Sequence, residues 1–263
     1  MKKAKIKIGF IGCGNMGKSL ATAICKTSNP IYICDRHPER LSGLISESGA
    51  VFCDALTVAR ECKYIFIAVK PNGMQSAVDN ISPILKERGD GYTVVSLAAG
   101  IDLFTLERFF GFDCPIIRIM PNTPVAVGEG VTVYCENSMV NKETLSEFEN
   151  IMRYSGKVDR ISEEKIDAAM ALSGCSPAFV YTFAEALADG AVECGLPRDK
   201  ARLYAALTLL GSAKMLLESG CHSAELKDAV CSPGGVTIKG IHALEEGAFR
   251  GTVMNAVKKA FGE

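Results

Sequence analysis

The segment Gly12-Cys13-Gly14-Asn15-Met16-Gly17 decides the fold of the N-terminal half. It follows residues 6–12, an apolar run that predicts a buried β-strand, and it opens residues 16–26, which predict an α-helix. In a G-x-G-x-x-G turn of this kind, the first glycine permits a tight turn, the second lets the backbone approach a pyrophosphate, and the third lets helix and strand pack closely. Such glycines can also be purely structural, so the interpretation as a dinucleotide site needs support from neighbouring residues.

The chain beyond this turn alternates between apolar runs and amphipathic segments with short connections. This alternation predicts a doubly wound α/β domain of the Rossmann type over residues 1–162, with a mostly parallel sheet covered by helices on both faces. We expect strands at residues 31–34, 51–53, 64–69, 93–98, 115–120 and 130–134, and helices at 40–48, 55–61, 75–86, 102–109 and 142–154.

An acidic residue at the end of the second predicted strand supports dinucleotide binding. Asp35 follows Gly12 by roughly twenty residues, the spacing at which a carboxylate binds the adenosine ribose hydroxyls and favours NAD. Arg36 comes next and could take a 2′-phosphate, with help from Arg40. Asp35 could instead cap the following turn only. The pattern favours tolerance of both NADH and NADPH.

Residues 163–263 contain no convincing strand and predict an all-α domain. We expect Ser176 and Pro177 to start a helix that runs over 178–194 and ends at Gly195, followed by a second helix over 200–218. Both helices are apolar on most sides and therefore have to be buried on most sides. A segment of about 100 residues is too small to do this alone. We therefore expect an intertwined homodimer, or an oligomer of dimers.

The composition excludes several classes of protein. The 263 residues are 48% hydrophobic and 22% charged, with a formal net charge of −1, so no basic field would gather nucleic acid or an anionic membrane. We find no candidate membrane span and no signal-peptide pattern. The 11 cysteines form no C-x-x-C pair and no zinc-type cluster. They predict reduced thiols in a cytoplasmic protein that needs no metal.

The helical half carries the segment that identifies a family. Residues 226–238, Leu-Lys-Asp-Ala-Val-Cys-Ser-Pro-Gly-Gly-Val-Thr-Ile, with residues 243–250 after them, closely resemble the C-terminal signature of pyrroline-5-carboxylate reductases. Residues 68–71, 96–100, 119–124 and 172–178 are also similar to motifs of that family. The resemblance extends from Gly9 to Arg250.

The resemblance implies an NAD(P)H-dependent oxidoreductase that reduces the cyclic imine 1-pyrroline-5-carboxylate to L-proline, the last step of proline biosynthesis. Together with the glycine turn, it assigns cofactor binding to Ile11, Gly12, Cys13, Gly14, Asn15, Met16, Gly17, Asp35, Arg36, Ala68, Val69, Lys70, Pro71, Leu97, Ala98 and Ala99. It assigns substrate binding to Glu163, Ser232, Gly234, Gly235, Val236 and Thr237. Lys70 could equally be an ordinary solvated charge at a strand end.

The implied reaction depends more on positioning the substrate and the cofactor than on a strong general acid. An imine accepts hydride readily once its nitrogen is protonated, and the iminium can carry a proton taken from water. We expect the glycine turn at 232–237 to bind the substrate carboxylate through backbone N–H groups, although Ser232 could simply cap the next helix. Thr237 is the candidate catalytic residue, through a hydrogen bond to the ring nitrogen. His37, His222 and His242 fit surface or structural roles.

Some positions depart from the family pattern, and other interpretations compete. Ala55 and Ala229 stand where asparagine is common near the cofactor, and Cys175 and Cys231 replace small residues. A β-hydroxyacid-type dehydrogenase would need a lysine on the first long helix of the second domain, but residues 166–197 hold no Lys or Arg. A non-catalytic dinucleotide sensor on the same scaffold would be expected to lose the turn at 232–237.

Overall fold

A computed structural model describes residues 5–262 of the chain. The chain divides into two compact units, Met1–Gly174 and Cys175–Glu263. The sequence predicts a domain boundary after residue 162, where the helical half of the chain begins. Residues 163–174 are indeed helical, but they belong to the first compact unit. The domain boundary after residue 162 therefore stays a prediction.

The first unit is built on an eight-stranded sheet of order β3-β2-β1-β4-β5-β6-β7-β8. Only β6 and β7 run antiparallel, and the other neighbouring strands are parallel. The order reverses direction at β1, which lies between β2 and β4, as in doubly wound folds. The strands are β1 (Ile8–Ile11), β2 (Ile31–Cys34), β3 (Val51–Phe52), β4 (Tyr64–Ile67), β5 (Thr93–Ser96), β6 (Ile116–Pro121), β7 (Gly130–Glu136) and β8 (Gly156–Arg160).

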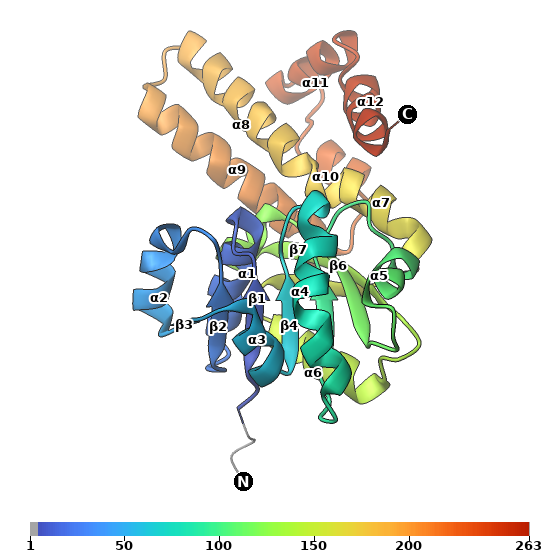
Figure 1. Ribbon diagram of the computed structural model, residues 1–263. Coiled ribbons are helices and arrows are strands. Elements are labelled where there is room, and N and C mark those ends of the chain that lie inside the picture. The colour runs from blue at the N-terminus through green and yellow to red at the C-terminus, as the bar shows by residue number, and fades with distance from the viewer. Residues whose placement is uncertain (1–4, 263) are drawn as a thin grey trace. The chain divides into compact units, whose positions relative to one another are not determined.

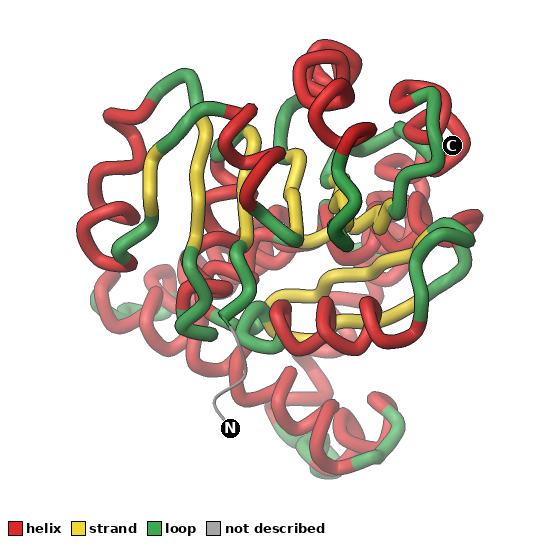
Figure 2. The backbone as a smooth tube through the Cα atoms, turned by 60° about the horizontal axis from the view of Figure 1, so that its bottom comes forward, coloured by secondary structure: helices red, strands yellow, loops and turns green. Residues whose placement is uncertain are grey.

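Helices cover both faces of this sheet (Figures 1 and 2). One apolar cluster joins the sheet to α3, α4 and α5, and the other joins it to α1, α2 and α6. The predicted α/β class is therefore confirmed. The helices are α1 (Asn15–Cys25), α2 (Ser42–Ser48), α3 (Ala55–Glu61), α4 (Met74–Glu87), α5 (Leu103–Phe110), α6 (Lys142–Met152) and α7 (Ile166–Ala169), with 3₁₀ turns at Pro38–Leu41, Pro71–Gly73, Thr123–Val127 and Glu163–Lys165 and a π turn at Met170–Gly174.

The central strands are apolar because both of their faces are buried. Every residue of β1 and β4 is buried, as expected for parallel strands with helices on both sides. Phe10 and Phe66 stack on one face with ring centroids 4.8 Å apart. This packing holds the carboxyl ends of β1 and β4 side by side, which is where the glycine turn begins.

Two local features differ from expectation. Strand β8 is missing from the sequence-based prediction, because its residues are polar and mostly exposed and show no apolar alternation. The expected N-cap at Ser176 is wrong. Cys175 occupies the cap position with helical dihedral angles (φ −90°, ψ −33°), and no side chain caps the helix. The π turn directly before it already delivers the chain in a helical conformation, so no capping side chain is needed.

The second unit is all-α, as predicted. It consists of α8 (Ser176–Glu193), α9 (Arg198–Ser219), α10 (Ser223–Ala229), α11 (Val236–Glu246) and α12 (Phe249–Phe261). Its buried apolar cluster contains only Ala188, Ala201 and Ala205, where α8 and α9 pack together. Many large apolar side chains of α8 and α9 are exposed, including Leu217 at 86%. Within residues 5–262, no helix combines the length and hydropathy that a membrane span requires.

Candidate functional site

The glycine turn adopts the geometry that its spacing predicts. Gly12 has φ +80°, a left-handed conformation that glycine adopts without strain, and its N–H donates to the Cys34 carbonyl at 2.8 Å. A Cβ on Gly17 would lie 3.0 Å from the Gly12 carbonyl oxygen, so α1 and β1 pack as closely as predicted. Gly14 precedes α1, and a Cβ there would meet no atom within 4 Å. The start of α1 therefore faces open space, with first-turn N–H groups that have no partner within the helix.

A cavity of about 980 Å³ opens at this turn. It lies at the carboxyl ends of β1, β2 and β4, the point where the strand order reverses and where doubly wound proteins bind ligands. Of the predicted cofactor residues, the cavity is lined by Ile11, Gly12, Cys13, Gly14, Asp35, Arg36, Ala68, Val69 and Lys70. Three segments that are far apart in the sequence thus meet at one site.

Asp35 connects two of these segments. Its Oδ2 accepts a hydrogen bond from the Cys13 N–H at 2.6 Å, and its Oδ1 accepts one from the His37 N–H at 2.8 Å. The second bond is the turn-capping contact that the sequence left as an alternative. The first holds the glycine turn against the end of β2. Asp35 therefore holds the backbone of the site in place, and this role is independent of any contact with a ribose.

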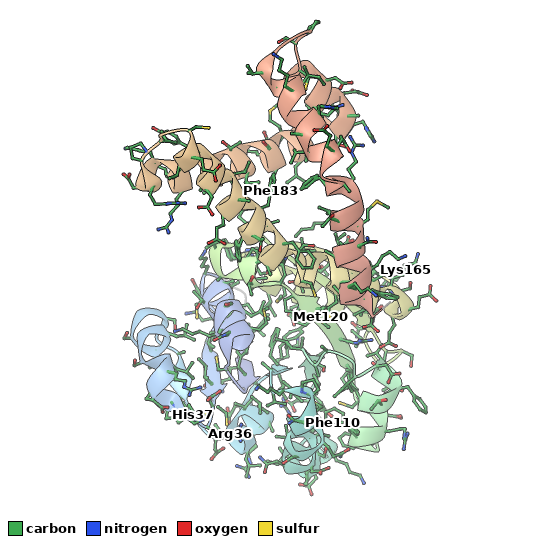
Figure 3. The ribbon with its side chains drawn as sticks, turned by 90° about the horizontal axis from the view of Figure 1, so that it is seen from above. Arg36, His37, Phe110, Met120, Lys165 and Phe183 are labelled. Atoms are coloured by element: carbon green, nitrogen blue, oxygen red, sulfur yellow. The ribbon has the colours of Figure 1, made fainter. Side chains whose placement is uncertain are left out.

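The cavity is lined by more positive than negative charge. Arg36, Arg40 and Lys70 line it, and among the described residues that do so the one carboxylate is that of Asp35. Figure 3 shows Arg36 and His37 next to one another on the same side of the first unit. Both arginines are exposed, so their guanidinium groups can move toward a ligand. This charge distribution suits an anionic ligand with several phosphates.

The Cys13 thiol inside the glycine turn is not a nucleophile. Burial, and secondarily the charge of Asp35, raises the pKa of Cys13 to about 12. The thiol is therefore protonated near neutral pH and acts as a small apolar group.

Other cofactor candidates are not part of the cavity lining. Asn15, Met16 and Gly17 belong to α1, and Pro71 starts a 3₁₀ turn. Leu97, Ala98 and Ala99 follow β5, where the Leu97 N–H donates to the Ile67 carbonyl at 3.2 Å. The cavity wall also includes residues that are not among the predicted cofactor contacts. Besides Ala55, which the family pattern places near the cofactor, they are Cys34, His37, Asn72, Gly73, Ser76, Ala77 and Asn80. The last five lie in the 3₁₀ turn Pro71–Gly73 and in the first part of α4, which follow β4 in the chain.

Glu163 is held by a buried arginine. Its Oε1 accepts hydrogen bonds from the Leu103 N–H at 2.7 Å and from Arg118 Nη1 at 3.0 Å. Arg118 lies in β6, its side chain is 4% exposed, and it also reaches Asp167 at 3.3 Å. Arg118 is not among the residues predicted from the sequence. The signal available was a single cation inside the otherwise apolar run Ile116–Met120.

The predicted substrate residues of the second unit form one tight turn. The Gly235 N–H donates to the Ser232 carbonyl at 3.0 Å, and Gly234 has φ +72°. Gly235, not Ser232, occupies the N-cap of α11, so the interpretation of Ser232 as the capping residue is wrong. The Gly235 N–H is already bonded within the turn. Val236 and Thr237 stand in the exposed first turn of α11, where backbone N–H groups have no partner within the helix.

The three histidines have local partners. His222 Nδ1 accepts a hydrogen bond from the Ala224 N–H at 3.2 Å and caps α10. His37 lies 3.3 Å from Glu39, and His242 lies 3.5 Å from Glu246. These contacts agree with surface and structural roles.

Both halves of the chain match known protein families. Residues 163–263 match the family described as pyrroline-5-carboxylate reductase dimerisation, and residues 7–100 match one described as NADP oxidoreductase, coenzyme F420-dependent. The chain is 42% identical to the pyrroline-5-carboxylate reductase of Escherichia coli over 258 residues, covering 96% of this chain and 95% of that one. It is 38% identical to the enzyme of that name from Pisum sativum, covering 96% and 93%.

Solved structures agree with these relatives. The crystal structure of Plasmodium falciparum pyrroline carboxylate reductase with NADP bound superposes with a TM-score of 0.86 at 35% identity, covering 97% of this chain and 95% of that one. A pyrroline-5-carboxylate reductase from Coxiella burnetii gives a TM-score of 0.88 at 32% identity, covering 98% and 97%. The identity and coverage are high enough to assign the family. The chain belongs to the pyrroline-5-carboxylate reductase family.

Proposed function

We propose that this protein catalyses the NAD(P)H-dependent reduction of 1-pyrroline-5-carboxylate to L-proline. The observation that carries the proposal is the similarity to named reductases over nearly the whole chain, which includes both the cavity at the glycine turn and the turn at Ser232–Thr237. A non-catalytic sensor would have no reason to keep the second turn. A β-hydroxyacid dehydrogenase would need a lysine that α8 lacks.

The residues of the first unit fit a dinucleotide. The cavity volume is in the range of small-molecule sites, and the open space at Gly14 allows the backbone to come close to a pyrophosphate. First-turn N–H groups of α1 would hold the pyrophosphate, and Lys70 would add a positive charge. The bound nicotinamide supplies the hydride.

The surroundings of Asp35 favour NADPH over NADH. Both carboxylate oxygens already accept backbone hydrogen bonds, and Arg36 and Arg40 are exposed beside the same cavity. A 2′-phosphate would gain charge-assisted hydrogen bonds from these guanidinium groups. Each Asp35 oxygen keeps a further lone pair, so NADH can still bind. We expect activity with both cofactors and a preference for NADPH.

The second unit supplies the substrate contacts in this proposal. The first-turn N–H groups of Val236 and Thr237 would bind the carboxylate, and the dipole of α11 would favour its negative charge. The Thr237 hydroxyl would hydrogen-bond to the ring nitrogen and fix the orientation of the ring. Glu163 would contribute to substrate binding, and its ion pair with Arg118 would fix its position. Catalysis would come from this positioning, with the imine proton taken from water.

The match to a dimerisation family indicates self-association. We propose that the assembly is a homodimer, or an oligomer of dimers, in which a second copy covers the exposed apolar side chains of α8 and α9. We further propose a cytoplasmic location. All 11 cysteines are free thiols, which suits a reducing compartment.

A spectrophotometric assay tests the proposed reaction. The loss of reduced-nicotinamide absorbance is followed for NADPH and for NADH, with and without pyrroline-5-carboxylate, and proline is measured as the product. Imine-dependent oxidation that forms an equal amount of proline is the expected result. Protein that binds NADPH but oxidises it with no imine dependence would support the sensor instead.

Thr237→Ala tests the assigned catalytic residue. A hydrogen bond to a charged group contributes about 1.5–3 kcal/mol, so we expect turnover to fall roughly 10- to 100-fold. The dissociation constant for NADPH should change less than about twofold. Thr252→Ala is the matched control, because the Thr252 hydroxyl only donates to the Ala248 carbonyl of its own helix. Equal losses of turnover and of NADPH binding in Thr237→Ala would contradict the role.

A further inference from the structure

Two cysteines face each other at the edge of the sheet beside the nucleotide cavity. Cys34 ends β2, and Cys53 directly follows β3. The parallel register pairs Tyr32 with Val51 and Ile33 with Phe52. One further step places Cys34 opposite Cys53. The ladder continues that far, because the Cys53 N–H donates to the Ile33 carbonyl at 2.9 Å. Figure 1 shows β2 and β3 as neighbours at this edge.

Both thiols project from the same face. Cys34 and Cys53 pack against the apolar cluster that contains residues of α3 and α4, whereas Ile31 and Ile33 belong to the cluster on the opposite face. Neighbouring strands lie about 4.8 Å apart, and a disulfide requires Cα atoms roughly 4.4–6.8 Å apart. The Cα spacing of this pair is therefore already within the range for a disulfide.

The edge strand can make the remaining adjustment. A disulfide needs Cβ atoms about 3.5–4.5 Å apart, somewhat closer than facing residues of parallel strands, so bond formation draws the two strands together slightly. Strand β3 has only two residues, and Val51 and Phe52 are 47% and 44% exposed. Few packed atoms resist its movement. Residual strain would make the bond easy to reduce again.

Solvent reaches the pair through the cavity. Cys34 lines the cavity wall, and Cys53 is half-buried beside it. Burial raises the pKa of both thiols, with smaller contributions from Asp54 and Asp35 at Cys34 and from Cys34 and Asp54 at Cys53. The thiolate fraction is therefore small near neutral pH, and the reaction with an oxidant is slow but not blocked.

We propose that Cys34 and Cys53 form a modification site, a dithiol that a small disulfide such as glutathione disulfide oxidises to an intrachain disulfide. The Cys34 thiolate attacks one sulfur of glutathione disulfide, forming a mixed disulfide and releasing one glutathione thiolate. The Cys53 thiolate then attacks the Cys34 sulfur and releases the second glutathione. In sum, two protein thiols lose two electrons and two protons, and one glutathione disulfide becomes two molecules of glutathione.

Peptide mapping tests this site directly. The folded protein is incubated with glutathione disulfide, free thiols are alkylated, and trypsin digestion follows. Cleavage after Lys26, Arg36, Arg40 and Arg60 gives peptides 27–36 and 41–60, and each contains one cysteine. The expected product is a disulfide-linked pair of these two peptides that dithiothreitol separates.

Variants and a denatured control make the result specific. Cys53→Ser should lose the linked pair completely, while Cys25→Ser should form it as the wild type does. Cys25 is a matched control because it is also half-buried with a pKa raised by burial, but it packs against the other face. In urea the fold no longer selects a partner, so linkage should scatter among the 11 cysteines.

Two results would overturn the proposal. One is folded wild-type protein in which peptides 27–36 and 41–60 carry only glutathione or alkyl groups. The other is a 27–36 peptide linked as often to other cysteines as to Cys53. Both are read from the wild-type protein, so the test remains decisive if a variant fails to fold.

Discussion

Alanine at Gly12 should mainly destabilise the fold, whereas alanine at Gly14 should mainly weaken cofactor binding. A Cβ at Gly12 would lie 2.9 Å from the Ala68 carbonyl oxygen and 2.9 Å from Val69 Cγ1, on a backbone with φ +80°. A Cβ at Gly14 would meet no protein atom within 4 Å, and its φ is −62°. The first position is closed by the fold, and the second is open toward the cavity.

The expected magnitudes follow from these contacts. Left-handed backbone costs an alanine about 1–2 kcal/mol, and crowding in a packed site costs about 1–3 kcal/mol. Gly12→Ala should therefore lose roughly 2–5 kcal/mol of unfolding free energy, a large part of the total stability of a domain. Gly14→Ala replaces only an N-cap glycine and should lose about 1 kcal/mol or less. However, its methyl group stands where the pyrophosphate would approach, so NADPH should bind at least about tenfold more weakly, roughly 1.4 kcal/mol.

Urea unfolding followed by circular dichroism measures the stabilities, and calorimetric titration with NADPH measures the affinities. A Gly14→Ala protein that binds NADPH like the wild type would refute the role given to Gly14. A loss of unfolding free energy in Gly14→Ala as large as that in Gly12→Ala would refute the difference between the two positions.

Three further predictions concern charged groups. Hydrogen bonds from the side chain and the backbone N–H of Thr105 lower the pKa of Asp102, so its stabilising contribution is present above about pH 4 and is lost as pH falls through its lower folded-state pKa. Urea midpoints measured from about pH 6 to about pH 2 should therefore fall more steeply for the wild type than for Asp102→Asn. Arg118→Met should lower the unfolding free energy by about 1–3 kcal/mol, because Glu163 loses its cation but stays partly exposed; unchanged urea midpoints would contradict this. Arg36→Ala should raise the KM for NADPH about fivefold and change that for NADH less than about twofold, and equal changes would exclude a 2′-phosphate contact.

The sequence was sufficient to predict the elements that carry a strong local pattern. The glycine turn, the apolar strands before and after it, and the long helices of the second unit all lie close to their expected positions. Strand β8 was not predictable, since Lys157, Asp159 and Arg160 face solvent and form no apolar alternation. It becomes a strand through pairing with β7, which is a non-local interaction.

The site was predictable only where its residues share a motif. The spacing from Gly12 to Asp35 indicated a dinucleotide fold, but it could not show that the Asp35 carboxylate binds the Cys13 N–H. That contact depends on β1 and β2 being neighbours. In the same way, the partnership of Arg118 with Glu163 joins β6 to a segment 45 residues later, and nothing in either local sequence indicates it.

The small core of the second unit has a thermodynamic consequence. A buried cluster of three alanines offsets little of the conformational entropy of ordering five helices, so in the proposed dimer this unit would gain much of its stability from the second copy. Folding is then linked to association by mass action. The melting temperature should rise with protein concentration, and specific activity should fall on dilution once the copies separate. For such an enzyme, the cellular concentration would set the fraction of chains that are assembled and active, in addition to the total number of chains.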